Sequence, residues 1–462
     1  MGTLDLDVKL CRRLTALQET AREFGRDVVR PAGVELDRLH DPADVIAKDS
    51  VLWDVFRGFR ERGLHKAMIP KAFGGTIGDI PSLATPLINE EMGYADGGLA
   101  VSMLVACMPF AFAILSPHAE IRNWARDFVR DSRGEMIGCW AITEPDHGTD
   151  WVLGTSKEGC DPRTAPGLTA VKKGDEYIVN GWKSAWVSNG TIATHAVLHV
   201  GLDPSKGVHG SGLALCPLDL PGVSRGAPLN KIGQRALNQG EIIFDEVKLH
   251  KKYMLLASPE FFGANHFGHS FLGLANSSMG VTWASQAQAS FDEALRYARS
   301  HSRGGVTLAD RKDVKIRLFR MFAKVEAARL LARKVSNHFF AMMSSPMFSL
   351  AASRKTTFWA MSNALHLYLQ AHERYESVKR FSRRATHPEK HSELMDWGQY
   401  GVLSKITATE TACEVAADAV RILGEDAALP GCLVEKMLRD ARASTIEDGV
   451  NDALALASCE GL

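Results

Sequence analysis

The pattern of hydrophobic and polar positions divides the chain into three zones. In residues 1–137, apolar and charged residues recur at spacings of three and four, which is typical of amphipathic helices. From 138 to 256 the texture changes to short β-rich pieces between clusters of Gly, Pro, Asn and Asp. From 257 to 462, long helical runs with few breakers return. The sequence therefore predicts an α+β fold with an α-helical domain, a small antiparallel sheet or barrel domain, and a second helical domain.

Individual elements follow from the same pattern. The spacing predicts helices over Val8–Val29, Leu52–Gly63, Val281–Ser300, Val314–Phe340, Gly398–Leu423 and Leu433–Ser444. Alternation and β-branched content predict strands over Leu168–Val171, Glu176–Val179, Thr194–Val200, Gly212–Cys216 and Glu241–Phe244. None of these strands alternates with a helix, so βαβ units are not expected.

One apolar run, Gly98–Leu115, approaches the length of a membrane span. Pro109 lies near its middle and small residues dilute its hydrophobicity. We expect a helix buried in the protein core and no membrane association.

Composition narrows the class of protein. The chain has 462 residues, enough for two to three domains, with 54 Lys plus Arg and 54 Asp plus Glu. A formal net charge of zero argues against nucleic acid as a partner. The eight cysteines are scattered without a CxxC pair, which is typical of a reducing, cytoplasmic environment. Neither common glycine-rich nucleotide fingerprint, GxGxxG or GxxxxGK followed by Ser or Thr, is present.

Three segments carry candidate chemistry. The first, Ala141–Asp150, reads as a strand entering a tight loop with hydroxyls and free backbone N–H groups, suited to flavin oxygens or phosphates. By itself it also reads as an ordinary turn.

The second segment runs from Tyr177 to Gly190. Asn180-Gly181 predicts a hairpin turn, and the returning strand would place Trp186 and Ser188 on one face. An aromatic ring and a hydroxyl on one face suit a flavin ring, although a core-facing Trp explains the pattern equally well.

The third segment follows the helix predicted at Leu433–Ser444. Glu447-Asp448-Gly449 places carboxylates in a tight turn, where an apolar cavity would raise the pKa and favour a base. A solvated Asp-Gly turn is the alternative.

The three segments occur in an order that resembles the acyl-CoA dehydrogenase family. The resemblance rests on four motifs. The first two are Thr143-Glu144-Pro145 with Gly148-Thr149-Asp150, and Asn180-Gly181 with Lys183, Trp186 and Ser188-Asn189-Gly190. The last two are Lys231–Leu237 with Ile242–Leu249, and Val434–Lys436 with Arg439–Arg442 and Asp448-Gly449. Phrases near the N-terminus, Val28–Ala32, Ile69–Gly75 and Glu90–Asp96, also fit. The match spans nearly the whole chain apart from about 342–395.

The resemblance implies an N-terminal helical domain, a β-barrel domain and a C-terminal four-helix bundle, with FAD bound non-covalently at their junction. By motif match, the FAD contacts are Thr143, Thr149, Trp186 and Ser188. Asp448 aligns with the family's catalytic carboxylate, and Glu447, one position earlier, is the competing candidate. The implied partners are an acyl-CoA substrate, an electron-transfer flavoprotein or another electron acceptor, and further copies of the chain in a homotetramer or homodimer.

The chain departs from the family at four places. The base position is Asp448 where glutamate is usual, as in nitroalkane oxidase and some dehydrogenases of cyclic acyl-CoAs. Phe271–Asn276 replaces the FDxxR phrase that helps to bind CoA. His301–Gly305 replaces RxxFG, which leaves Arg303 as the nearest substitute for the arginine that meets the FAD pyrophosphate across a subunit interface. Ile422–Glu425 replaces the HGG loop, where the backbone at Gly424 can still approach FAD.

The resemblance therefore implies a dehydrogenase in which a carboxylate removes the α proton while flavin N5 accepts hydride from the β carbon, forming an α,β-unsaturated acyl-CoA. A bulky or cyclic acyl group is expected. The alternative is a nitroalkane-oxidase-like flavin oxidase that deprotonates an acidic carbon. Against it, that enzyme's active-site arginine should lie seven residues after the base, where this chain has Ala455. A non-catalytic FAD-binding relative is a third possibility.

Two further groups are interpreted structurally. The extra segment at 342–395 is predicted to form a solvated basic face. Alternatively, its basic side chains bind the phosphates of CoA. These side chains are Arg354, Lys355, Lys379, Arg380, Arg383, Arg384, His387 and His391. His195 and His199 share a strand face, but no third ligand accompanies them, so no metal site is predicted.

Overall fold

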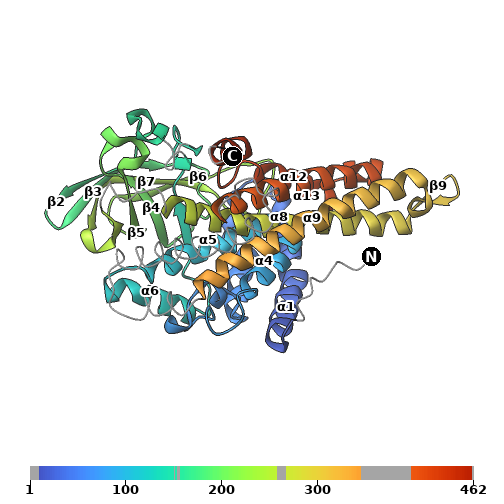
Figure 1. Cartoon of the computed structure of the whole chain (residues 1–462), viewed down its shortest axis with the longest axis horizontal. Coiled ribbons are helices and arrows are strands. Elements are labelled where there is room, and N and C mark those ends of the chain that lie inside the picture. Colours follow the sequence, from blue (N-terminus) through green and yellow to red (C-terminus); the bar gives the residue numbers. More distant parts are fainter. Residues whose placement is uncertain (1–9, 150, 153–156, 258–266, 345–396, 460–462) are drawn as a thin grey trace, which may run out of the picture.

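The computed structural model describes residues 10–149, 151–152, 157–257, 267–344 and 397–459. The sheet lies at one end of the molecule and a long helical bundle extends to the other (Figure 1). The predicted order of helices, sheet and helices is confirmed.

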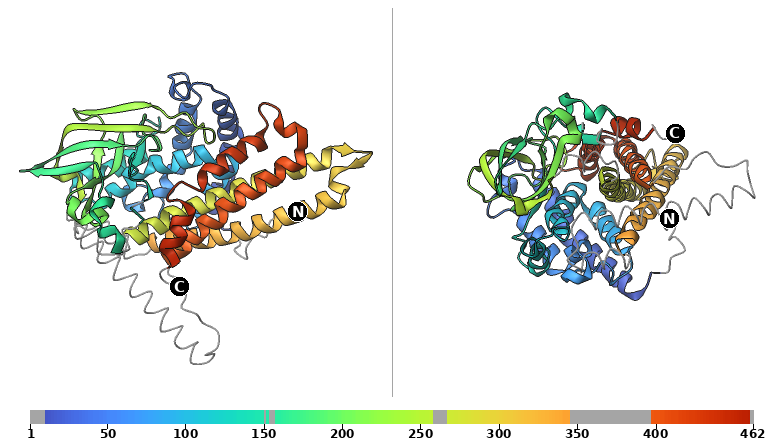
Figure 2. Two further views of the ribbon diagram at one scale, coloured as in Figure 1. Left: turned by 90° about the horizontal axis from the view of Figure 1, so that it is seen from above. Right: turned by 60° about the vertical axis from the view of Figure 1, so that its left-hand side comes forward.

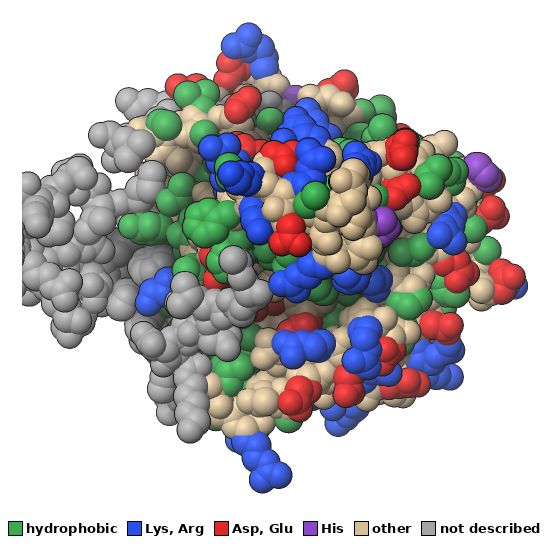
Figure 3. Space-filling model, turned by 90° about the vertical axis from the view of Figure 1, so that its right-hand side faces the viewer, with side chains coloured by type: hydrophobic (Ala, Val, Ile, Leu, Met, Phe, Trp, Pro, Cys, Tyr) green, Lys and Arg blue, Asp and Glu red, His purple; other side chains and the backbone are tan. Residues whose placement is uncertain are grey.

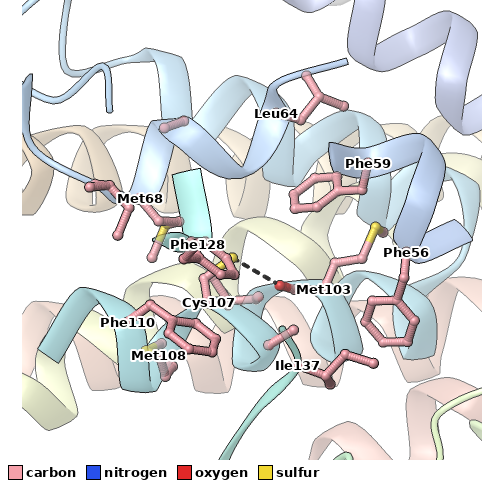
Figure 4. Packing of buried hydrophobic residues seen from close by; sticks show 14 of the residues in the cluster. Phe56, Phe59, Leu64, Met68, Met103, Cys107, Met108, Phe110, Phe128 and Ile137 are labelled. Carbon is pink, nitrogen blue, oxygen red and sulfur yellow. Dashed lines mark hydrogen bonds between the residues drawn. The ribbon is translucent and has the colours of Figure 1, made fainter. Parts of the chain in front are cut away.

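The N-terminal part is helical and is built around a buried core. Its main elements are α1 (Arg12–Phe24), a π-helical turn (Gly25–Val29), α2 (Arg30–Asp37), α3 (Leu52–Glu61), α4 (Ala84–Ala95), α5 (Gly97–Ala113) and α6 (Ala119–Arg130). Aromatic rings from α3, α5 and α6 fill this core, and Phe110 stacks on Phe128 with ring centroids 4.4 Å apart (Figure 4).

The apolar run is the buried helix that the sequence predicted. It forms α5, whose side chains are almost all buried and which contains Pro109. Its first turn is capped by Asp96, whose Oδ1 accepts a hydrogen bond from the N–H of Leu99 at 2.9 Å. Among the described residues, no helix has both the length and the apolar character needed to cross a bilayer.

The sheet has eight strands. They are β1 (Gly138–Ala141), β2 (Thr169–Lys173), β3 (Glu176–Lys183), β4 (His195–Gly201), β5 (Ser211–Pro217), β6 (Val223–Pro228), β7 (Gly240–His250) and β8 (Met254–Leu256). Their order is β6-β7-β3-β2-β4-β5-β8, and β1 pairs with β4. Most pairings are antiparallel as predicted, but β1 joins β4 in parallel, and so does β2 at the single pair Thr169–Gly201.

The hairpin predicted at Asn180-Gly181 is wrong. Strand β3 continues through both residues, and the register against β7 shifts there as in a β-bulge. Asn180 holds the bulge through its side chain, which donates to Glu246 Oε1 at 2.6 Å and accepts from the Glu246 N–H at 2.8 Å. Gly181 takes the unusual φ of 125° that the bulge needs. The chain reverses instead at Gly174-Asp175, between β2 and β3.

The residues of β4 alternate between two cores. Val197 faces the N-terminal helices and packs with residues of α5, whereas Ala196, Leu198 and Val200 face the interior of the sheet domain. This alternation of apolar residues on both faces explains why β4 is buried along most of its length. The sheet is thereby fixed on α5, next to the loops that carry the candidate site.

The C-terminal part is a helical bundle of α8 (Phe267–Ser300), α9 (Lys312–Met343), α12 (Trp397–Leu423) and α13 (Leu433–Ser444), followed by α14 (Asn451–Cys459). Helices α8, α9 and α12 run side by side along the long axis (Figure 2). A short hairpin, β9 (Ser302–Arg303) and β10 (Val306–Thr307), joins α8 to α9 at the tip. Backbones approach closely where Gly401 faces Gly273, since a Cβ on Gly401 would lie 2.4 Å from the Gly273 carbonyl oxygen.

Candidate active site

The first motif forms a loop that is held to β3 by a buried ion pair. Lys183 Nζ lies 2.5 Å from Glu144 Oε1, and both side chains are buried. The Glu144 carboxylate also accepts the N–H groups of Gly167 at 2.5 Å and Leu168 at 3.2 Å. Burial lowers the pKa of Lys183, and the Glu144 charge opposes that shift. The loop therefore has a fixed position, with Thr143 half-buried beside it.

Trp186 and Ser188 lie in an irregular stretch after β3, and the strand predicted to carry them is wrong. This stretch is tied to the start of β7 by Gln239, whose Nε2 donates to the Trp186 carbonyl at 2.9 Å and to Ser188 Oγ at 3.3 Å. The Trp186 side chain is 57% exposed, so it is not the core-facing Trp that was the alternative. The Thr143 carbonyl accepts the Ser184 N–H at 2.9 Å, which brings the two motifs together. Thr149 lies further along the same loop.

The third motif is a turn between α13 and α14 in which two successive residues have positive φ. Asp448 has φ 51° and Gly449 has φ 101°. Such a conformation is uncommon for a non-glycine residue and aims the side chain in a direction that regular structure does not allow. The Asp448 side chain is half-buried, and no described residue donates a hydrogen bond to its carboxylate. Glu447 differs, because its Oε2 accepts Gln234 Nε2 at 3.0 Å.

Two lysines flank these carboxylates. Lys405 on α12 donates to the Gly449 carbonyl at 2.8 Å and to Asn451 Oδ1 at 2.7 Å. Lys231 donates to the Leu237 carbonyl and to Gln239 Oε1, each at 2.7 Å. Burial lowers the pKa of both lysines to about 8, although nearby carboxylates oppose the shift.

Burial has the opposite effect on the carboxylates. It raises the pKa of Glu447 to about 7, against the hydrogen bond from Gln234 and aided by the charge of Asp448. Burial also raises the pKa of Asp448, and the Lys405 charge lowers it. The turn thus holds two carboxylates whose affinity for a proton is increased, as a general base requires.

A second buried charge cluster, formed by Lys436, Asp96 and Asp440, is linked to the turn through Gln234. Lys436 on α13 contacts Asp96 Oδ2 at 2.6 Å and Asp440 Oδ2 at 2.5 Å. Asp440 Oδ1 accepts the N–H of Gln234 at 2.5 Å. The same Gln234 that contacts Glu447 is thereby fixed to α13. The sequence analysis did not predict that Gln234, Lys231 and Lys405 belong to the site. For Lys405, a lysine on the apolar face of a predicted helix could have indicated a functional position.

Arg303 and Gly424 are brought together at the tip of the bundle. Gly424 has φ 65°, and a Cβ there would lie 2.7 Å from Arg303 Nη2. Arg303 is exposed, and this pair lies at the opposite end of the molecule from the sheet (Figure 1). Seen from the tip, the surface mixes Lys and Arg with Asp and Glu side chains (Figure 3).

Two other predictions concern basic side chains. The basic residues of the extra segment, Arg354 to His391, lie outside the described residues. Burial lowers the pKa of His195 to about 4 and that of His199 to about 3. Trp140 Nε1 donates to His199 Nε2 at 2.9 Å. No cluster of three potential metal ligands occurs in the described part of the chain.

The chain matches the three domain models of one family. Residues 13–118 match the acyl-CoA dehydrogenase N-terminal domain, 139–247 the middle domain, and 269–364 with 365–460 the C-terminal domain.

Two relatives show the extent of the similarity. Glutaryl-CoA dehydrogenase of Desulfococcus multivorans is 28% identical over 72% of this chain and 79% of its own length. Cyclohex-1-ene-1-carbonyl-CoA dehydrogenase of Syntrophus aciditrophicus is 25% identical over 94% of this chain and 86% of its own.

Solved structures show the same fold. Butyryl-CoA dehydrogenase from Megasphaera elsdenii superposes with a TM-score of 0.74 at 19% identity, covering 98% of this chain and 99% of that one. A nitroalkane oxidase superposes with a TM-score of 0.76 at 17% identity, covering 99% and 96%. The fold, the order of the motifs and the match to all three domain models lead to one conclusion: this chain belongs to the acyl-CoA dehydrogenase family, FAD-dependent oxidoreductases that act on CH–CH groups.

Proposed function

We propose that this enzyme oxidises an acyl-CoA to the α,β-unsaturated thioester, with Asp448 as the base. The observation that carries the proposal is the state of the Asp448 carboxylate. It is half-buried in a left-handed turn, its pKa is raised by burial, and no described residue hydrogen-bonds to it. Glu447, the alternative, has an oxygen engaged by Gln234.

The chemistry follows from this arrangement. A thioester carbonyl acidifies the neighbouring α C–H, and Asp448 accepts that proton on a carboxylate oxygen. The raised pKa favours proton capture, while the Lys405 charge opposes that shift and favours the ionised carboxylate. FAD supplies the acceptor for the hydride that leaves the β carbon. Aspartate is one methylene shorter than the usual glutamate, so the substrate carbon must lie nearer to the turn.

We assign the FAD contacts to two groups of residues. Thr143, Thr149, Trp186 and Ser188 lie around the sheet, where an exposed indole offers a face to a flavin ring. Arg303 and Gly424 lie at the other end of the bundle, where the guanidinium is exposed and suited to a pyrophosphate. The separation supports a homodimer or homotetramer in which the tip of one copy completes the cofactor site of another.

The domain limits that we propose are 1–137, 138–256 and 257–462. They are supported by the strands of the eight-stranded sheet, which begin with β1 at Gly138 and end with β8 at Leu256.

We further propose a bulky or cyclic acyl group as the substrate. The shorter base leaves room for it, and the similarity to cyclohex-1-ene-1-carbonyl-CoA dehydrogenase extends over 94% of this chain. An electron-transfer flavoprotein is the proposed acceptor.

A nitroalkane-oxidase-like activity is the second candidate. Asp448 favours it, and so does Arg303-Gly304-Gly305, which resembles the Arg-Gly-Gly phrase of nitroalkane oxidase at this place. The fold is also shared with nitroalkane oxidase. Ala455, where an arginine would be expected, argues against it.

The test is anaerobic mixing of the FAD-loaded enzyme with cyclohexane-1-carbonyl-CoA, butyryl-CoA, glutaryl-CoA and simple nitroalkanes, followed by flavin absorbance. Bleaching by an acyl-CoA with slow reoxidation in air supports the dehydrogenase. Bleaching by nitroalkanes alone, with rapid reoxidation, supports the oxidase.

The base assignment is tested with two variants. Asp448→Asn should lower the bleaching rate by about 1,000-fold or more, because its amide cannot accept the proton. Glu447→Gln should retain most of the rate. If Asp448→Asn keeps the full rate and Glu447→Gln loses it, the two carboxylates have been assigned in the wrong order.

A further inference from the structure

The turn that carries Asp448 is under conformational constraint. Asp448 and Gly449 both have positive φ, and only Gly449 adopts such values without a steric cost. A strained conformation of this kind persists only where surrounding contacts hold it in place. Those contacts decide where the Asp448 carboxylate lies.

The contacts come from one face of α12. Lys405 is completely buried, and its ammonium reaches across to the Gly449 carbonyl at 2.8 Å and to Asn451 Oδ1 at 2.7 Å. Thr409, one turn further along, accepts Asn451 Nδ2 at 3.1 Å and donates to the Lys405 carbonyl at 2.9 Å. The N–H of Asn451 donates to the Thr445 carbonyl at 3.0 Å. The turn is therefore pinned on both sides of Asp448.

We infer that Lys405 is a positioning residue, whose ammonium holds the Asp448–Gly449 turn in the conformation that the base needs. The inference rests on the proposed role of Asp448. Lys405 uses its hydrogens on a carbonyl and an amide oxygen, and no described residue hydrogen-bonds to the Asp448 carboxylate, so the base keeps its lone pairs.

The charge of Lys405 has a second consequence. The charged groups that face it are Asp448 and Glu447 on the turn and Glu410 on its own helix. Glu447 in addition faces Lys231 and Gln234 from the segment before β7. For Asp448, Lys405 is the cation that lowers the pKa. Removing it should shift the base toward a higher pKa as well as loosen the turn.

The experiment compares Lys405→Met with Ser404→Ala, both FAD-loaded. Ser404 is the neighbouring buried residue of α12, and its hydroxyl has no hydrogen-bond partner among the described residues, which makes it a matched control. Turnover is measured with whichever thioester of the panel bleaches the flavin fastest. Backbone hydrogen exchange of residues 445–451 is measured without any substrate.

For Lys405→Met we expect kcat to fall by about 100-fold with KM within about threefold, because a displacement of about 1 Å costs that much in a positioned reaction. The acidic limb of the pH profile should move up by roughly one pH unit. Exchange across 445–451 should accelerate. Ser404→Ala should change none of these quantities. A Lys405→Met enzyme with unchanged kcat, pH profile and exchange overturns the inference.

Two further variants keep the test decisive. Asn451→Ala removes one acceptor of the ammonium but leaves its charge, so kcat should fall by about tenfold without movement of the acidic limb. If Lys405→Met fails to fold, an Asn451→Ala enzyme with unchanged kcat and exchange overturns the inference alone. Lys405→Arg should recover the position of the acidic limb, because it restores the charge.

Asp448→Asn is measured in parallel to separate the two proposals. If it keeps full turnover, the assignment of the base has failed, whatever Lys405 does. If it is inactive while Lys405→Met behaves like the parent enzyme, the base stands and only the role of Lys405 is rejected.

Discussion

The sheet domain and the turn after α13 each bury a carboxylate close to a lysine, and the two regions use them in opposite ways. At the sheet, Lys183 bonds directly to Glu144, and two backbone N–H groups bond to the same carboxylate. At the turn, Lys405 bonds to a carbonyl and an amide oxygen, and none of the described residues hydrogen-bonds to the Asp448 carboxylate.

The difference separates a structural carboxylate from a candidate base. The Glu144 carboxylate accepts hydrogen bonds from Lys183 and from two backbone N–H groups, so its charge stabilises the loop. Asp448 has lone pairs available and a pKa raised by burial. Proximity to a lysine is therefore a poor guide to function; the partner of each lysine hydrogen is the better one.

The largest expected effect comes from breaking the pair at the sheet. Lys183→Met leaves Glu144 charged and buried without its cation, which should lower the free energy of unfolding by about 3–5 kcal/mol. Guanidinium unfolding followed by far-UV circular dichroism measures the loss. The exposed pair Lys251–Asp175 supplies the control, and Lys251→Met should leave the free energy of unfolding almost unchanged.

A double variant sharpens this result. Glu144→Met together with Lys183→Met removes both charges and should recover much of the stability, because no buried charge is left unpaired. Equal losses in the single and double variants would show that Glu144 stabilises the loop through its backbone N–H contacts and that the ion pair contributes little.

A smaller effect is expected from Gln234. Gln234→Met removes the donor to Glu447 Oε2 at 3.0 Å and should cost about 1–3 kcal/mol, the usual loss for a buried acceptor without a partner. The pKa of Glu447 should rise further, since this hydrogen bond holds it down. Thermal unfolding between pH 5 and pH 8.5 measures both effects. A stability loss that is the same at every pH would mean that Gln234 does not act through the Glu447 carboxylate.

Much of this picture could be predicted from the sequence. Leu433–Ser444 was predicted to the residue as α13, and the buried nature of α5 followed from Pro109 and its small residues. The Asn180-Gly181 hairpin failed because the same dipeptide also suits a bulge, and the choice depends on Glu246, which lies 66 residues away.

The surroundings of the candidate base could not be predicted from the sequence, because they too depend on residues distant in the chain. The position of Asp448 before a glycine is visible in the sequence, but its left-handed φ is not. The partners of this turn, Gln234 and Lys405, come from segments distant in the chain, and only the packed structure brings them to it. Local sequence patterns predict caps, helical periodicity and turns. The partner of a buried charge is set by tertiary contacts between residues distant in the sequence, which local patterns do not contain.

The smallest expected effect is the pH dependence of stability that the Glu447 carboxylate causes. Burial raises its pKa from an ordinary 4.5 to about 7, so between these values the folded protein binds more protons than the unfolded chain. Stability should therefore fall as pH rises through this window, and the loss should be complete above pH 7. Glu447→Gln carries no such penalty and should unfold about 1–3 °C above the parent enzyme at pH 8 but close to it at pH 5. Glu410→Gln, an exposed carboxylate of α12, should show no gain at either pH. A gain at pH 5 that equals the gain at pH 8 would mean that the Gln side chain simply packs better, and that the turn does not hold a carboxylate with a raised pKa.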